Sequence, residues 1–234
     1  MTRAQKALVA VAVLAAIALL CFPEALEAHG VSRRDAAFVR TIEGPAPTPF
    51  AYLGAKHMVT GYDHLLFLVG VIFFLHRLRD VLIYVSLFTL GHSATLLAGV
   101  LGNVQANPYL IDAIIGLSVV YKGFENVGGF DEVIGWRPDT RAAVLVFGLF
   151  HGFGLATKLQ DLSLPPRGLV ANLISFNVGV EIGQGLALTA VLLGLLYWRA
   201  RPGFARHAFL ANSVLMLGGF LLVGYQVAGY VVTR

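Results

Sequence analysis

Six apolar segments follow one another along this chain, and each is about as long as a helix that crosses the hydrocarbon core of a lipid bilayer. The chain is 57% hydrophobic and only 13% charged, whereas about a quarter of the residues in a soluble domain are charged. The sequence therefore predicts an all-α fold, a polytopic integral membrane helical bundle with six transmembrane helices in the lipid bilayer. No basic tract points to a nucleic-acid partner. The segments extend over residues 52–75, 80–101, 108–127, 141–159, 168–198 and 207–232.

A further apolar stretch precedes this bundle. Arg3 and Lys6 are followed by apolar residues 7–22 and by small residues ending at Ala28, which is the pattern of a secretory signal peptide. We expect residues 1–28 to be a signal peptide, or a seventh helix if it is retained as a signal anchor. Residues 29–51 would then be a short external segment, and 52–234 the transmembrane domain. Cleavage after Ala28 would place the amine and the imidazole of His29 together, where they could chelate a metal.

The distribution of arginines predicts the orientation. The loop after the second segment has no lysine or arginine, whereas the loops after the first, third and fifth contain seven arginines: Arg77, Arg79, Arg137, Arg141, Arg199, Arg201 and Arg206. Because basic loops stay in the cytoplasm, we expect a multi-pass protein of the bacterial inner membrane whose mature N-terminus and Arg234 are periplasmic. Arg33, Arg34 and Arg40 oppose this count, and a translocated signal peptide would override them.

The first segment contains three ionisable residues within eight positions: His57, Asp63 and His64. On one continuous helix the two histidines would lie two turns apart on nearly the same face, with Asp63 about a quarter-turn from His64. An ionisable side chain in lipid is costly, so such residues usually face a protein interior and mark function. The structural alternative is a pair of histidines that hydrogen-bond between helices without any ligand.

Depth in the membrane connects this segment to the others. Counting about 1.5 Å per residue places His64, His92, His151 and Glu181 near the middle of a hydrocarbon core about 30 Å thick. These residues come from four helices of alternating direction, so we expect them to converge on one buried site. His57 would lie nearer the outer face.

Other polar residues in the same segments are expected to support this site or to line a pathway to it: Ser93, Glu125, Asn177 and Gln184. For Glu125 the alternative is an ion pair with Lys122, one turn earlier on the same helix. Lys158 is expected to extend toward the membrane interface, as long basic side chains near helix ends do.

The predicted site is a metal site with nitrogen and oxygen ligands. The only cysteine, Cys21, lies in the predicted signal peptide, so thiolate ligands and internal disulfides are excluded. Imidazoles with carboxylates suit Ni²⁺, Co²⁺, Zn²⁺, Mn²⁺ or Fe, and Cu(II) also remains open. Asp63 could bind the metal directly or orient a histidine ring through its Nδ1 atom. The candidate ligands are His57, Asp63, His64, His92, His151 and Glu181.

Five motifs, in order along the chain, resemble those of the HupE/UreJ membrane proteins. They are His57-x5-Asp63-His64, Phe88-Thr-Leu-Gly-His92-Ser, Glu125-Asn126, Phe150-His151-Gly-Phe-Gly and Phe176-Asn177-x-Gly-x-Glu181-x-Gly-Gln184. That family is associated with hydrogenase and urease gene clusters, and some members are regarded as nickel permeases. The first motif is also similar to the signature helix of nickel–cobalt transporters, which implies that its histidines and aspartate recognise metal.

One departure from the permease-type members leaves the identity of the metal open. Those members carry a second histidine and a glutamate shortly after their Phe-His-Gly motif, whereas this chain continues Phe153-Gly154-Leu155-Ala156.

Three functions are compatible with these observations. The leading hypothesis is a non-enzymatic permease for a divalent transition metal, with nickel or cobalt as the first candidates, in which helices expose a midplane site alternately. The second is an intramembrane metalloenzyme with Glu125 or Glu181 as general base. The third is a metal-binding accessory subunit of a larger membrane complex. A protein partner or a homo-oligomer is compatible with each of them.

Overall fold

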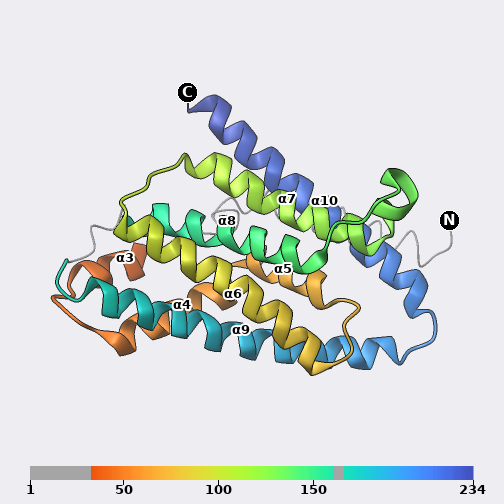
Figure 1. Cartoon of the computed structure of the whole chain (residues 1–234), viewed down its shortest axis with the longest axis horizontal. Coiled ribbons are helices and arrows are strands. Elements are labelled where there is room, and N and C mark those ends of the chain that lie inside the picture. The colour runs from red at the N-terminus through yellow and green to blue at the C-terminus, as the bar shows by residue number, and fades with distance from the viewer. Residues whose placement is uncertain (1–32, 161–165, 234) are drawn as a thin grey trace.

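The computed structural model describes residues 33–160 and 166–233, and within these residues all regular structure is helical (Figure 1). The predicted signal segment, Cys21 and His29 lie outside the described residues. The helices are α3 (Arg33–Arg40), α4 (Pro47–Thr60), α5 (Tyr62–Ile72), α6 (Leu78–Leu101), α7 (Pro108–Asn126), α8 (Thr140–Gln160), α9 (Leu169–Arg199) and α10 (Phe204–Val232), with a π-helical turn at Phe130–Ile134.

Four of these helices, α6, α8, α9 and α10, are long and apolar enough to cross a membrane, and α5 is a shorter apolar helix. Helices α6 to α10 begin and end within a few residues of the last five predicted segments. The all-α prediction of a multi-pass membrane protein is confirmed at this level.

The first predicted segment is not one helix, and this corrects the expectation that His57 and His64 share a helical face. Helix α4 begins earlier than predicted, with Pro47 in its first turn, a position where proline is favourable because no N–H is needed. The helix ends at Gly61, whose φ of −76° and ψ of 85° leave the helical region. Glycine is a poor helix former, so the break is tolerated there. Helix α5 then starts at Tyr62.

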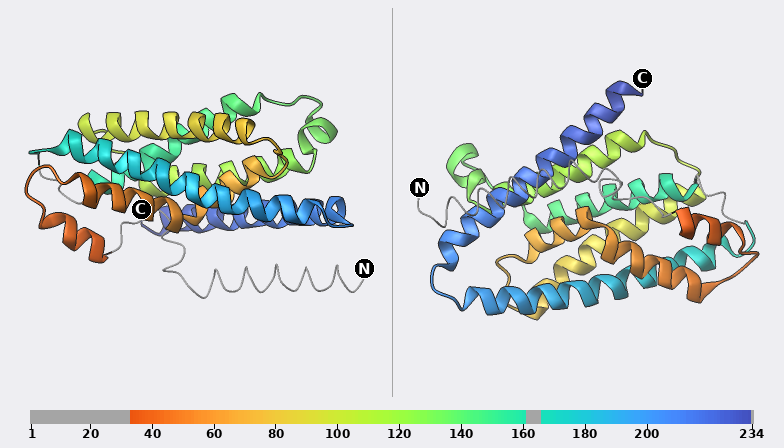
Figure 2. Two further views of the ribbon diagram at one scale, coloured as in Figure 1. Left: turned by 90° about the horizontal axis from the view of Figure 1, so that it is seen from below. Right: turned by 180° about the vertical axis from the view of Figure 1, so that it is seen from behind.

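Helices α4 and α5 continue in the same general direction, and from α5 to α10 successive helices run in opposite directions, so the bundle has two ends (Figures 1 and 2). The Pro108 end contains the first residues of α4, α7 and α9, and there Gln160 Nε2 donates to the carbonyl oxygens of Gly99 and Val104 at 2.8 and 3.1 Å. The Arg77 end contains the end of α5 and the start of α6. There the Arg199 guanidinium donates to carbonyls at the end of α5, which satisfies acceptors that a helix C-terminus leaves unpaired.

Three helix pairs pack most closely: α6 with α8, α4 with α9, and α7 with α10. Glycines allow this approach. A Cβ atom added at Gly152 of α8 would lie 2.0 Å from the carbonyl oxygen of His92, and one added at Gly179 of α9 would lie 1.9 Å from that of Ala51. Backbones can approach so closely only where a side chain is missing, which is how helices associate in membranes without a hydrophobic driving force between them.

The Gly152→Ala variant should therefore lower the apparent melting temperature of the purified, detergent-solubilised protein. Overpacking a close contact costs about 1–3 kcal/mol, and here the nearest atom is a backbone oxygen that cannot rotate away. The matched control is Gly194→Ala, because Gly194 lies in α9 with nothing within 4 Å of an added Cβ. The control should be neutral or slightly stabilising, since alanine favours helix. Equal melting temperatures for the two variants would contradict the close α6–α8 contact.

Candidate metal centre

Four histidines from four helices meet in the interior of the bundle. His64 of α5 lies at their centre, with ring centroids 5.1 Å from His57 of α4, 5.7 Å from His92 of α6 and 4.6 Å from His151 of α8. The side chain of His57 is 8% exposed, and the other three are fully buried. The predicted convergence of His64, His92 and His151 is therefore present, and His57 joins them because of the helix break at Gly61.

Three of these rings could bind one ion together. His57, His64 and His92 each offer one ring nitrogen, and these atoms lie within 4.8 Å of one another. Three imidazole nitrogens bound to the same ion, each about 2.1 Å away, lie about 3.4–3.6 Å from one another. Side-chain adjustments of about 1 Å would therefore bring the three nitrogens to coordinating distance.

Hydrogen bonds fix the orientation of two of the rings. Asp63 Oδ1 accepts from His64 Nδ1 at 2.9 Å and from the His64 backbone N–H at 2.8 Å. The carbonyl oxygen of Phe147 accepts from His151 Nδ1 at 2.7 Å. Because carboxylate and carbonyl oxygens only accept, both Nδ1 atoms carry the proton, and each Nε2 presents its lone pair. Such a bond to an oxygen is what usually orients a metal-bound histidine.

His92 is the most informative member of the cluster. Its ring is fully buried, and neither of its two nitrogens has a hydrogen-bond partner among the residues that the structure describes. Buried polar atoms are nearly always paired, and leaving one unpaired costs about 1–3 kcal/mol. A ring nitrogen in this position, with other imidazoles around it, is well placed to bind a cation.

Phenylalanine rings enclose the cluster. Phe88 lies 5.0 Å from His151 and 6.0 Å from His64 between ring centroids, and Phe67 lies 5.5 Å from His151. Both phenylalanines are fully buried. They exclude water from this side of the histidines, so charge brought into the cluster is screened weakly.

Polar residues of α9 hold this helix against α6. Asn177 accepts from Ser93 at 3.0 Å, and Gln184 accepts from Thr89 at 2.9 Å. Both bonds connect α9 to α6. Ser93, Asn177 and Gln184 therefore position the helix that carries His92.

Glu181 departs from the prediction, because its side chain is exposed on α9 and is not brought to the buried histidines. Asn177 and Gln184 face α6, and Glu181 lies about 40° and 60° further around the helix from them. Counting along the helix axis predicted a depth for Glu181, but it could not predict the direction in which the side chain points.

Glu125 lies at the Arg77 end of the bundle. Its carboxylate pairs with Lys122 Nζ at 2.6 Å and also accepts from the Thr140 hydroxyl. The Lys122–Glu125 ion pair, which was the alternative expected for Glu125, is therefore present. Both residues line a cavity of about 280 Å³ at this end, together with Asn126 and Arg137.

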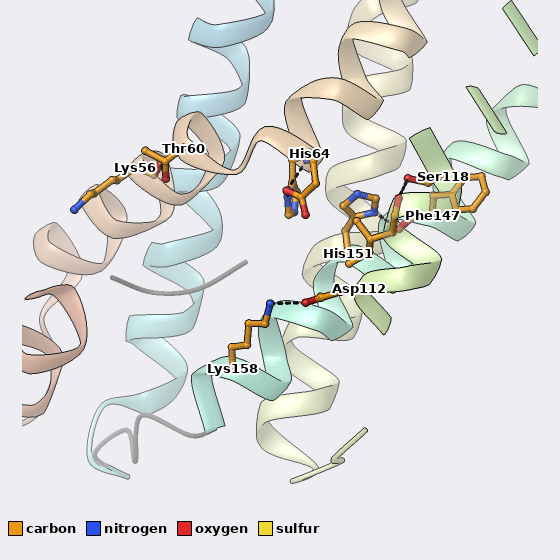
Figure 3. A network of polar contacts seen from close by, with 10 residues as sticks. Lys56, Thr60, His64, Asp112, Ser118, Phe147, His151 and Lys158 are labelled. Carbon is orange, nitrogen blue, oxygen red and sulfur yellow. Dashed lines mark hydrogen bonds and ion pairs between the residues drawn. The ribbon is translucent and has the colours of Figure 1, made fainter. Parts of the chain in front are cut away.

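One ion pair near the histidines was not predicted from the sequence. Lys158 Nζ donates to Asp112 Oδ2 at 2.8 Å, so this lysine points into the bundle and not to the interface as predicted. Figure 3 shows the pair beside His64 and His151, on the side toward the end of α8. The sequence contained one indication that Lys158 points inward: it follows His151 by about two turns and so lies on the same helical face.

The sequence of this chain matches one known protein family. The sequence model of a family described as HupE / UreJ protein matches residues 33–234, which cover all the described helices. Searches of curated proteins and of solved structures gave no match. The chain therefore belongs to the HupE/UreJ family of membrane proteins, a family linked to nickel and cobalt uptake.

Proposed function

We propose that this protein is a membrane permease for a divalent transition metal, with Ni²⁺ and Co²⁺ as the first candidates. The observation that carries the proposal is His92, whose two ring nitrogens are buried without a hydrogen-bond partner among the described residues, beside other buried imidazoles. The family's link to nickel and cobalt uptake supports it independently.

In this proposal His57, His64 and His92 provide the ligands, and Asp63 orients His64 and supplies negative charge. His151 lies against His64 and offers a fourth imidazole as the ion moves. Imidazole nitrogens suit Ni²⁺, Co²⁺ and Zn²⁺. The described residues contain no cysteine, so sulfur-preferring ions such as Cu(I) are disfavoured.

The broken first segment supports transport. Many secondary transporters bind their substrate near the bilayer midplane, where a transmembrane helix is interrupted. Non-helical backbone at this depth is tolerated only where protein or a water-filled cavity surrounds it. Here Gly61 interrupts the helix between His57 and His64, and Gly61 is itself buried. We propose that α4 and α5 together form the first of six spans.

The two alternative functions have less support. Glu125 and Glu181, the expected general bases of a metalloenzyme, do not reach the histidines: the first is paired with Lys122, and the second is exposed. An accessory subunit would bind metal without moving it across the bilayer, so a flux measurement separates it from a permease.

Purified wild-type protein should bind Ni²⁺ or Co²⁺ at one site per chain, and His92→Ala should weaken this binding by about tenfold or more, because one of three ligands is lost. Isothermal titration calorimetry and elemental analysis would measure this. The matched control is His76→Ala, because His76 is an exposed histidine in the α5–α6 loop. A wild type without metal affinity, or a His92→Ala variant that binds as tightly as the control, would refute the site.

Proteoliposomes that contain the wild-type protein should accumulate Ni²⁺ or Co²⁺ around an enclosed metal-sensitive dye. His92→Ala should reduce the initial rate by about tenfold or more, since the ion can no longer be held at the midplane. Protein-free liposomes and the His76→Ala variant are the controls. Metal binding without any uptake would instead support the accessory-subunit hypothesis.

We propose that the Arg77 end is cytoplasmic and the Pro108 end periplasmic, in agreement with the positive-inside rule. In a Cys21→Ser background, a cysteine at Arg201 should react with a membrane-impermeant maleimide only after the cells are opened. A cysteine at Gln105, in the exposed α6–α7 loop at the other end, should react in intact cells. The reverse labelling pattern would invert the proposed topology.

A further inference from the structure

A second charged group lies beside the histidines. The Lys158–Asp112 ion pair joins α8 to α7 at 2.8 Å, and its side chains are 20% and 9% exposed. Removing two charges from water costs several kcal/mol per ion, so a buried pair is weak evidence for a purely stabilising role. The position of the Lys158–Asp112 pair beside the histidines therefore needs an explanation other than stability.

The pair belongs to the electrostatic surroundings of the cluster. Lys158 acts electrostatically on His57, Asp63 and His64, and Asp63 acts on Asp112. Asp112 lies in the second turn of α7, which starts at Pro108, and Lys158 lies in the last turn of α8, so the pair is on the Pro108 side of His151. Figure 3 shows this pair near His64 and His151. An ion that entered from this end would pass the pair before it reached the histidines.

A fixed ammonium group at this point opposes the binding of a cation. Neutral imidazoles leave both charges of a divalent ion uncompensated. Asp63 supplies one negative charge, and Asp112 can supply the second only if Lys158 no longer neutralises it. Because phenylalanines shield the cluster from water, this difference of one charge has a large effect on affinity.

We propose that Asp112 is a metal-receiving carboxylate at the Pro108 side of the histidines, and that Lys158 is a tethered cation which occupies it when no metal is present. This inference rests on the proposed permease function and adds the group that controls entry. An incoming divalent ion replaces the lysine ammonium on Asp112, and the lysine returns when the ion leaves.

The two side chains are suited to such an exchange. Lysine carries a compact charge on a flexible four-carbon chain, and Lys158 lies two residues before the end of α8. Its ammonium can therefore reach the interface, as long basic side chains do. Asp112 is short and nearly buried, and a Cβ atom added at Gly154 of α8 would lie 3.5 Å from its Oδ1. The carboxylate stays in place while the lysine moves.

A purely structural ion pair is the competing explanation, and the protein contains a matched example. Lys122 and Glu125 form a buried pair at 2.6 Å with exposures of 7% and 5%. Lys122 follows Asp112 on α7 by about 15 Å of helix. Replacing the lysine of either pair leaves a buried carboxylate without its cation, but only the Lys158–Asp112 pair lies next to the histidines.

The test compares Ni²⁺ affinity in purified, detergent-solubilised full-length protein by isothermal titration calorimetry. Lys158→Met should bind Ni²⁺ about tenfold or more tightly than wild type, because a repelling charge is removed and Asp112 is released. Asp112→Asn should bind about tenfold or more weakly. Lys158→Arg, which keeps the charge, should resemble wild type, and so should Lys122→Met.

Thermal melting with and without Ni²⁺ gives a second readout. Lys158→Met should melt lower than wild type without metal and show a larger stabilisation by Ni²⁺. Lys122→Met should melt lower with an unchanged stabilisation, because its stranded carboxylate lies away from the ion. If Lys158→Met does not fold, the Asp112→Asn/Lys158→Met double variant should bind Ni²⁺ more tightly than Asp112→Asn alone.

Unchanged or weaker binding by Lys158→Met, or by the double variant relative to Asp112→Asn, would overturn the inference and leave the permease proposal standing. An Asp112→Asn variant that binds Ni²⁺ as tightly as the wild type would also overturn the inference and leave the permease proposal standing. A wild-type protein that binds no metal would remove the proposed function, and this inference with it.

Discussion

The close contact between α6 and α8 is the constraint on which the histidine cluster depends. Gly152 lets the backbone of α8 approach the carbonyl oxygen of His92, and His151 is its immediate neighbour. The contact therefore sets the height of both histidines relative to each other. Helix α9 then holds α6 from the other side through Asn177 and Gln184. The glycine and amide residues of these motifs thus have a structural role, whereas the imidazoles provide the ligands in the proposed function.

The break at Gly61 is the second requirement. On a continuous helix, His57 and His64 would be about 10 Å apart along the axis, too far to share an ion. The interruption brings their ring centroids to 5.1 Å. It also places Asp63 in the first turn of α5, where its carboxylate accepts from both the ring and the backbone of His64. The same irregularity therefore brings two candidate ligands together and fixes the orientation of one ring.

The sequence was sufficient for whatever depends on position along a helix axis. Apolar length gave the bounds of α6 to α10 to within a few residues, and the fixed rise per residue placed His64, His92 and His151 at one level. The direction in which a side chain points around the helix axis was harder to predict. For this reason Glu181 was grouped with the three histidines, although its side chain is exposed. The break at Gly61 was missed because single glycines are common within membrane helices. The Lys158–Asp112 pair joins residues 46 positions apart, and such pairing depends on which helices are neighbours.

A permease must also release the ion that it binds, and the composition of the cluster bears on this. A site with several carboxylates directly around the ion would compensate its charge and hold it strongly. Here the groups nearest the centre are neutral imidazoles, and Asp63 is directed at His64. In surroundings that screen charge weakly, affinity then depends on the few charges around the cluster. In the proposed exchange, movement of the Lys158 charge would switch the site between holding and releasing a divalent ion, and no ligand would have to be withdrawn.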